Sequence, residues 1–185
     1  KFQEEYGYAL DAPKTWDEYA DIAKFFNGWD WMGDGRTRYG TAETWAAGWN
    51  WYMWQPRFAN YGGQYFDENM NPMINTQAGL DALNNMLASK DGQIDGVTNF
   101  KYADQRTMLS KGDVAMLFSW SSLAKFAELN EASEVAGDVG YAQLPGAVVN
   151  GELVRRASLV GGWSFGVPEY APNKDAAMCA LWYIS

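Results

Sequence analysis

The residues best suited to chemistry in this sequence are aromatic. Its 185 residues include ten tryptophans and eleven tyrosines but no histidine. Aromatic rings offer flat apolar faces on which a ligand can stack, and the polar edges of Trp and Tyr can hydrogen-bond to ligand hydroxyls. Histidine is the commonest metal ligand and a frequent general base, so its absence removes the usual centre of both kinds of chemistry. The composition therefore favours a binding protein over an enzyme.

A first candidate binding site lies around Trp120. The apolar run 114–118 predicts a buried strand, and the next helix is expected to begin near Ser121 or Ser122. Ser119 and Trp120 would then lie where a strand ends and a helix begins. Ligands of α/β proteins collect at such places, and a helix N-terminus adds free backbone N–H groups. The alternative is that Trp120 fills the core, as most tryptophans do.

A second candidate site follows further along the chain. The paired glycines Gly161 and Gly162 would let a ligand approach the backbone closely, and Trp163 beside them could form a stacking platform or cleft wall. Arg156, preceded by Arg155, could hydrogen-bond to hydroxyls or to an acidic group of a ligand. For the two arginines a surface hairpin is the alternative.

The enzyme motifs in the sequence are incomplete. Residues 162–166 match the Gly-x-Ser-x-Gly pattern of α/β-hydrolases, but no histidine can accept the serine proton. A calcium-loop pattern that begins at Asp67 fails where Pro72 replaces the turn glycine. The single Cys179 leaves neither a disulfide within the chain nor a multi-cysteine zinc site. We expect no catalytic residue, no metal and no cofactor, although 23 acidic residues leave a glycosidase carboxylate pair open.

The charge and hydropathy patterns narrow the class of partner. The chain has 14 basic and 23 acidic residues, for a net charge of −9, and its basic residues are scattered. Nucleic-acid binding needs clustered Lys and Arg, so it is disfavoured. No apolar run approaches the roughly 20 residues of a membrane span, and the first residues show no signal-peptide pattern.

Local signals predict helices that alternate with short extended segments. Thr15 and Glu18 form a capping box, and Gly112 follows a basic last turn. Helices are expected over about 16–27, 42–60, 102–111 and 121–130, from 76 and from 173, with strands near 39–41, 114–118 and 139–142 and a hairpin-like excursion over 64–74. This pattern predicts one α/β domain, rich in helices and with a small mixed sheet, cut from a larger protein.

Seven motifs follow one another in a specific order along almost the whole chain. They are Pro13 to Tyr19, Tyr39-Gly40, Gly62-Gly63 with Phe66-Asp67, Ser110 to Met116 with Trp120, Val139 to Ala142 with Leu144-Pro145-Gly146, Gly161-Gly162-Trp163, and Lys174 to Ala180. This succession resembles the extracellular solute-binding proteins of ABC transporters, in particular their sugar-binding group. The resemblance implies a type II periplasmic-binding-protein-like fold. It also implies that residues 1–185 form a single C-terminal ligand-binding lobe, without the N-terminal lobe.

The resemblance further implies a site and a function. Ligand is expected in the cleft between two lobes that close about a hinge, lined by the Trp120 loop and the turn that contains Trp163. Glu43 and Trp45 join the candidates because related maltodextrin binders use an acid and an aromatic residue in this region. The expected function is capture of a carbohydrate or polyol, and its delivery to an ABC permease, by a monomer in the periplasm or at the extracellular face of the membrane.

Three alternatives stay open at this point. The ligand could be anionic, such as a sugar acid or glycerol phosphate held by Arg155 and Arg156. The chain could be part of a glycoside hydrolase, which predicts turnover that depends on one carboxylate. It could also be a free-standing carbohydrate-binding module, which predicts tight binding without a second lobe.

Overall fold

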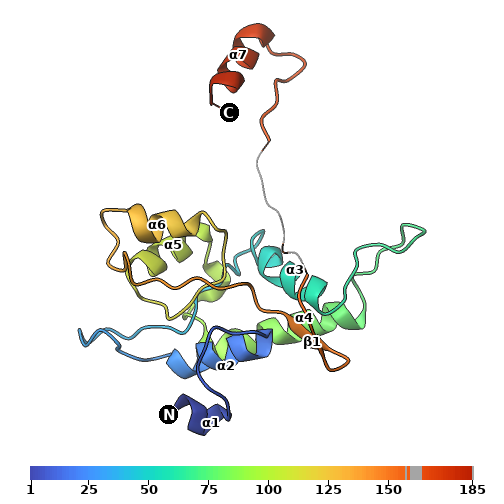
Figure 1. The fold of residues 1–185 in the computed structure, drawn as a ribbon. Coiled ribbons are helices and arrows are strands. Elements are labelled where there is room, and N and C mark those ends of the chain that lie inside the picture. The colour runs from blue at the N-terminus through green and yellow to red at the C-terminus, as the bar shows by residue number, and fades with distance from the viewer. Residues whose placement is uncertain (157, 159–163, 185) are drawn as a thin grey trace.

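The structure is a computed structural model of the chain and describes residues 1–156, 158 and 164–184. The regular elements in these ranges are helices and one two-stranded sheet (Figure 1). In chain order they are α1 (Phe2–Tyr6), α2 (Trp16–Phe26), α3 (Asn50–Asn60), α4 (Gln77–Ala88), the 3₁₀ helices η1 (Ser89–Gly92) and η2 (Val97–Asn99), α5 (Tyr102–Ser110), α6 (Leu123–Leu129), β1 (Ala147–Val149), β2 (Glu152–Val154) and α7 (Lys174–Ile184).

Most helix boundaries follow the local signals that predicted them. The Thr15 hydroxyl accepts the N–H of Glu18 at 3.1 Å and caps α2. The Glu18 carboxylate accepts the N–H of Lys14 instead of that of Thr15, so only half of the predicted capping box forms. Gly112, in the left-handed region at a φ of 64°, follows α5, and Ser122 precedes α6. The predictions of α2, α5, α6 and α7 are confirmed.

The predicted helix over 42–60 is wrong in its first half. Helix α3 begins at Asn50, and Trp45 and Trp49 precede it. The backbone N–H of Ala46 donates to the carbonyl of Phe100 at 3.1 Å, and Gly48 adopts a φ of 81°. Pairing with distant segments thus overrides a sequence pattern that is compatible with a helix.

The predicted mixed sheet is reduced, in the described residues, to one hairpin and isolated bridges. Strands β1 and β2 pair antiparallel, with Ala147 opposite Val154, around a turn at residues 150–151. Parallel bridges join Thr15 with Gly146, Tyr39 with Val114 and Thr41 with Gln93. The predicted strands near 39–41 and 114–118 are therefore extended segments that pair at single residues, and segment 139–142 is irregular.

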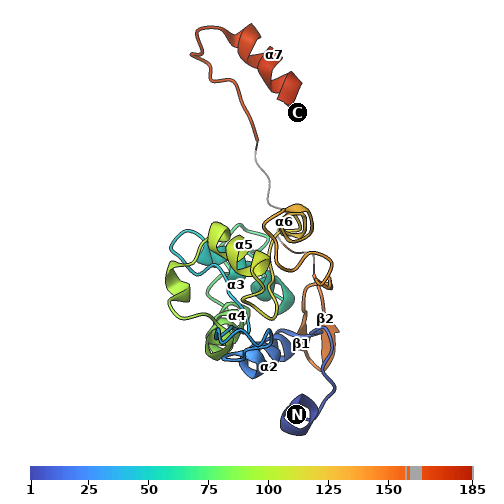
Figure 2. The ribbon, with the colours of Figure 1, turned by 90° about the vertical axis from the view of Figure 1, so that its left-hand side faces the viewer.

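The core lies where α2, α3 and α4 meet the segment that leads to Trp120, as Figures 1 and 2 show for the helices. Its buried residues are Trp16, Tyr19, Met53, Met86, Phe118 and Ala147. Gly40 passes so close to α2 that a Cβ would overlap the carbonyl oxygen of Ala23, so only glycine fits there. This packing fixes α3, the segment that leads to Trp120 and the segment before β1, which carry the candidate site.

Helix α7 lies apart from the rest of the protein in both views (Figures 1 and 2). None of its described residues is buried, although it carries apolar side chains such as Met178 and Tyr183. Cys179, a residue type that is often buried, is exposed here. Within the described ranges, no helix combines the length and the apolar character needed to cross a membrane.

Candidate ligand-binding site

A pocket of about 270 Å³ opens beside Trp120. It is lined by Tyr52, Met53, Phe118, Ser119, Trp120, Ser121, Leu144 and Ser158. Two residues predicted for the site, Ser119 and Trp120, are thus brought together. The lining combines aromatic and apolar surface with three serine hydroxyls, and none of these side chains carries a charge at neutral pH. Such a surface suits a ligand that is uncharged, has apolar faces and carries groups able to hydrogen-bond.

Neighbouring rings fix the plane of the Trp120 indole. Its centroid lies 5.0 Å from that of Tyr52, 5.4 Å from that of Tyr102 and 6.2 Å from that of Trp49. All three contacts are edge-to-face, the geometry that the ring quadrupole favours. Trp120 is only half-buried by these contacts. It is therefore a rigid wall of the pocket, in contrast to a tryptophan of the core.

Gln105 of α5 holds the Ser119 side of the pocket in place. It is fully buried. Its amide oxygen accepts the Ser119 hydroxyl at 2.9 Å, and its amide nitrogen donates to the carbonyls of Ala42 at 2.8 Å and Phe118 at 3.4 Å. Sequence reasoning missed Gln105, because a glutamine within a helix gives no signal that it points inward.

Replacing Gln105 with leucine is expected to lower the free energy of unfolding by about 1–3 kcal/mol, because the buried Ala42 carbonyl loses its partner and the Ser119 hydroxyl is released. Urea denaturation measures this change. The control is Gln77→Leu, the same substitution at an exposed helical position, which should change stability by no more than about 0.5 kcal/mol. Equal effects at both positions would contradict the role given to Gln105.

Glu43 lies in the core, where it forms an ion pair with Arg57. Neither side chain is exposed. The two groups form a bidentate pair, with Arg57 Nη2 2.7 Å from Glu43 Oε1 and Nη1 3.2 Å from Oε2. The indole N–H of Trp45 also donates to Glu43 Oε2, at 2.9 Å. Glu43 therefore has no surface to offer a ligand in this structure and positions Trp45 instead.

Arg57 is a structural residue of the core that sequence reasoning missed. Its remaining bonds go to the Met53 carbonyl at 2.7 Å and to Asn85 Oδ1 at 2.8 Å, and its guanidinium lies 4.5 Å from the ring centroid of Trp16. A buried charge persists only with such partners. The pair fastens α3 to the segment that carries Trp45.

Tyr19 is buried beside the Glu43–Arg57 ion pair, and these surroundings change its pKa. Burial and, after it, the charge of Glu43 raise the pKa of Tyr19. The phenol hydrogen-bonds with the Thr41 hydroxyl at 2.5 Å. Thr41 is bridged to Gln93, so the bond ties α2 to the backbone just before Glu43.

The two arginines of the second candidate site lie at the surface and do not line the pocket. The backbone N–H of Arg156 donates to Asn60 Oδ1 at 2.7 Å, and its guanidinium approaches the Gly63 carbonyl at 3.5 Å. Arg155 bonds to Gln143 and to the Lys14 carbonyl. Gly161, Gly162 and Trp163 lie outside the described residues.

Comparison with known proteins identifies the family. The family model described as "Bacterial extracellular solute-binding protein" matches residues 1–182. A curated protein of Sinorhizobium fredii, named a probable amino-acid ABC transporter periplasmic-binding protein, is 28% identical over 176 residues, which are 90% of this chain and 35% of that protein. The chain thus spans about a third of the length of this relative.

Solved structures with a similar fold come from the same class of protein. An ABC transporter solute-binding protein of Agrobacterium vitis with bound D-mannitol has a TM-score of 0.64 and 22% identity over 78% of this chain and 34% of that one. Maltose-bound MalE3 of T. maritima has a TM-score of 0.63 and 27% identity over 79% and 36%. A protein of Agrobacterium radiobacter in complex with ribitol has a TM-score of 0.63 and 21% identity over 79% and 35%.

These likenesses confirm the predicted periplasmic-binding-protein-like fold. The family is one of binding proteins, not of hydrolases. Its model covers nearly all of the sequence. The chain therefore belongs to the family of bacterial extracellular solute-binding proteins.

Proposed function

We propose that this chain is part of a protein that captures a neutral carbohydrate or polyol outside the cytoplasm and delivers it to an ABC permease. The observation that carries the proposal is the Trp120 pocket, where a fixed indole stands beside three serine hydroxyls and no charged side chain. A sugar offers apolar C–H faces to the ring and hydroxyls to the serines. Mannitol, maltose and ribitol, bound by proteins of similar structure, are ligands of this kind.

The proposed site is completed by a second lobe that closes over the ligand. The packed body up to Arg156 is the C-terminal lobe, and we assign α7 to the surface of the other lobe. The exposed apolar side chains of α7 support this assignment, because Met178, Tyr183 and Ile184 present apolar surface to solvent. The closed form is the one that the permease would recognise.

Each candidate residue has a distinct role in this proposal. Trp120 is the stacking platform, and Ser119 hydrogen-bonds to ligand hydroxyls. Trp45, oriented by Glu43, forms part of the cleft wall. Gly161, Gly162 and Trp163 lie outside the described residues and stay candidates for a second platform on the sequence pattern alone. The exposed guanidinium of Arg156 reaches ligand hydroxyls from the rim.

An anionic solute is the second candidate. The name of the Sinorhizobium relative points to an amino acid. Among the described residues the Arg156 guanidinium makes one hydrogen bond, at 3.5 Å to the Gly63 carbonyl, so this side chain could turn to a carboxylate. The uncharged lining of the pocket favours the neutral ligand, because a buried carboxylate needs a cation or several N–H donors to replace its water.

A thermal-shift screen of the intact two-lobed protein tests the proposal. We expect mannitol, ribitol, maltose or a related neutral compound to raise the Tm in a concentration-dependent way, since a ligand at 100 times its Kd adds about 2.7 kcal/mol of stability. Gluconate, glycerol phosphate and amino acids form the second arm. Stabilisation by compounds of that arm alone, or by none, would overturn the proposal.

A further inference from the structure

A second hollow, of about 720 Å³, lies between α5 and α6, which pack side by side in Figure 1. We call it the basic groove. It is lined by Arg106, Thr107, Ser110, Lys111, Ser122, Lys125, Phe126, Leu129, Asn130 and Ala132. None of these residues lines the Trp120 pocket. The groove is therefore a separate surface feature.

The groove concentrates positive charge on a strongly acidic chain. Three of its ten lining residues, Arg106, Lys111 and Lys125, are cations, and none is an acid, although the chain has a net charge of −9. Within the described part of the chain, none of the three forms an ion pair. A hollow lined by charges of one sign attracts a partner of the opposite sign. The groove is thus suited to an anionic partner.

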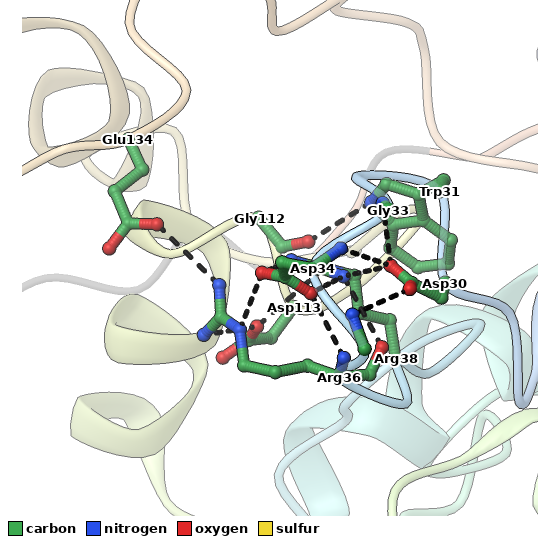
Figure 3. Close-up of polar contacts among 10 residues, drawn as sticks. Asp30, Trp31, Gly33, Asp34, Arg36, Arg38, Gly112, Asp113 and Glu134 are labelled. Carbon is green, nitrogen blue, oxygen red and sulfur yellow. Dashed lines mark hydrogen bonds and ion pairs between the residues drawn. The ribbon is translucent and has the colours of Figure 1, made fainter.

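Two acids that could have neutralised the groove, Asp113 and Glu134, form ion pairs with Arg36 instead (Figure 3). Asp113 and Glu134 each follow a lining residue by two positions in the sequence. Arg36 contacts both, with Nη1 3.3 Å from Asp113 Oδ1 and Nη2 3.6 Å from Glu134 Oε2, and its Nε lies 2.8 Å from Asp34. Both carboxylates are thus paired with Arg36, and neither lines the groove.

The remaining acids of this region do not enter the groove. Glu128 of α6 accepts the N–H of Gly137 at 2.9 Å and the hydroxyl of Tyr141 at 2.8 Å. Glu131 is exposed and lies outside the lining. Among the described residues, no carboxylate lines the groove or forms an ion pair with Arg106, Lys111 or Lys125.

A buried hydroxyl in the lining also lacks a partner. Ser110 is only 7% exposed, and its Oγ makes no hydrogen bond among the described residues. The Ser110 hydroxyl is therefore available to a polar group that enters the groove. Thr107 and Ser122 add further hydroxyls to the same wall.

The apolar part of the groove indicates what kind of anion it takes. The ring of Phe126 lies under the guanidinium of Arg106, 4.7 Å from its Cζ, and Leu129 is 76% exposed. A small inorganic anion would gain nothing from this apolar surface. A peptide segment can use both parts, since interfaces combine an apolar centre with a charged rim.

We propose that the basic groove binds an acidic segment of a protein partner. Carboxylates of that segment pair with Arg106, Lys111 and Lys125, and an apolar side chain between them covers Phe126 and Leu129. The inference does not depend on what the Trp120 pocket binds.

The test uses the intact protein and a fluorescently labelled 12-residue peptide with four glutamates around a central leucine. Fluorescence anisotropy should show binding that weakens as salt rises from about 50 to about 300 mM, because exposed charges are screened. The same peptide with glutamine for glutamate should bind at least about tenfold more weakly, and Lys111→Glu and Lys125→Glu should each weaken binding by about tenfold. Lys90→Glu, an exposed lysine outside both hollows, should leave it unchanged.

Four outcomes would overturn the proposal. The first two are that the peptide does not bind and that the glutamine peptide binds equally well. The third is that inorganic phosphate at millimolar concentration competes fully with the peptide. The fourth is that the lysine variants still bind the peptide but lose self-association or binding to phosphatidylglycerol vesicles. Circular dichroism of each variant should match that of the unmodified protein, which checks that the variant folds. The sugar-induced Tm shift should survive in Lys111→Glu, so failure of this proposal and failure of the proposed function are told apart.

Discussion

Replacement of Arg57 by methionine is expected to lower the free energy of unfolding by about 3–5 kcal/mol, the largest effect of any substitution proposed for this chain. The guanidinium of Arg57 is fully buried and donates one hydrogen bond to each carboxylate oxygen of Glu43. Methionine fills much of the volume but leaves a carboxylate in the core without its counter-charge. Denaturation in guanidinium chloride, followed by tryptophan fluorescence, measures the loss.

Two further variants show whether the loss comes from the unpaired charge. Glu43→Leu combined with Arg57→Met removes both charges and should recover a large part of the stability, because replacing a buried pair by apolar residues is often neutral. Lys24→Met breaks an exposed pair with Asp91, in which the charged atoms lie 4.0 Å apart, and should cost no more than about 1 kcal/mol. If Arg57→Met costs no more than Lys24→Met, the pair does not stabilise the core as described.

Replacement of Trp120 by alanine is expected to weaken sugar binding by about 30-fold or more, because a central aromatic contact typically contributes at least about 2 kcal/mol. Trp120→Phe should lose less, since it keeps a smaller ring in the same place. Isothermal titration calorimetry with the compound that gives the largest Tm shift measures both. Trp29→Ala removes a tryptophan that is 39% exposed and lies outside the pocket, and should leave the affinity unchanged. Equal affinities of the Trp120→Ala and wild-type proteins would contradict the site.

The elements predicted correctly from the sequence are those with local causes. Thr15 before α2 and Gly112 after α5 act on the turn next to them, so their effect can be read from a few residues. The turn at Asn150-Gly151, with φ values of 52° and 83°, is also a local signal. That hairpin was not predicted, and a hairpin was named only as an alternative for the two arginines that follow it.

The errors concern segments whose structure depends on distant partners. The backbone of Ala46 pairs with Phe100, and this contact cannot be foreseen from the aromatic pattern around Trp45. In the same way, Glu43 looks like an exposed acid until Arg57 is known to turn inward from the next helix. Glutamine and arginine are usually exposed, so only the fold shows that Gln105 and Arg57 support the site.

Only the part of the candidate site that directly follows a predicted strand in the sequence could be predicted. Trp120 and Ser119 follow directly from an apolar extended run that ends at the pocket. Tyr52 and Leu144 also line the pocket, but they come from segments far away in the sequence, and nothing in their local context distinguishes them from core residues.

A crystal structure of the intact two-lobed protein with its best-stabilising sugar or polyol tests the central claim most directly. We predict that ligand carbons lie about 4 Å from the indole of Trp120, in van der Waals contact, and that a ligand hydroxyl is hydrogen-bonded to Ser119 or Ser121. A ligand bound elsewhere, with no contact to Trp120, would contradict the account.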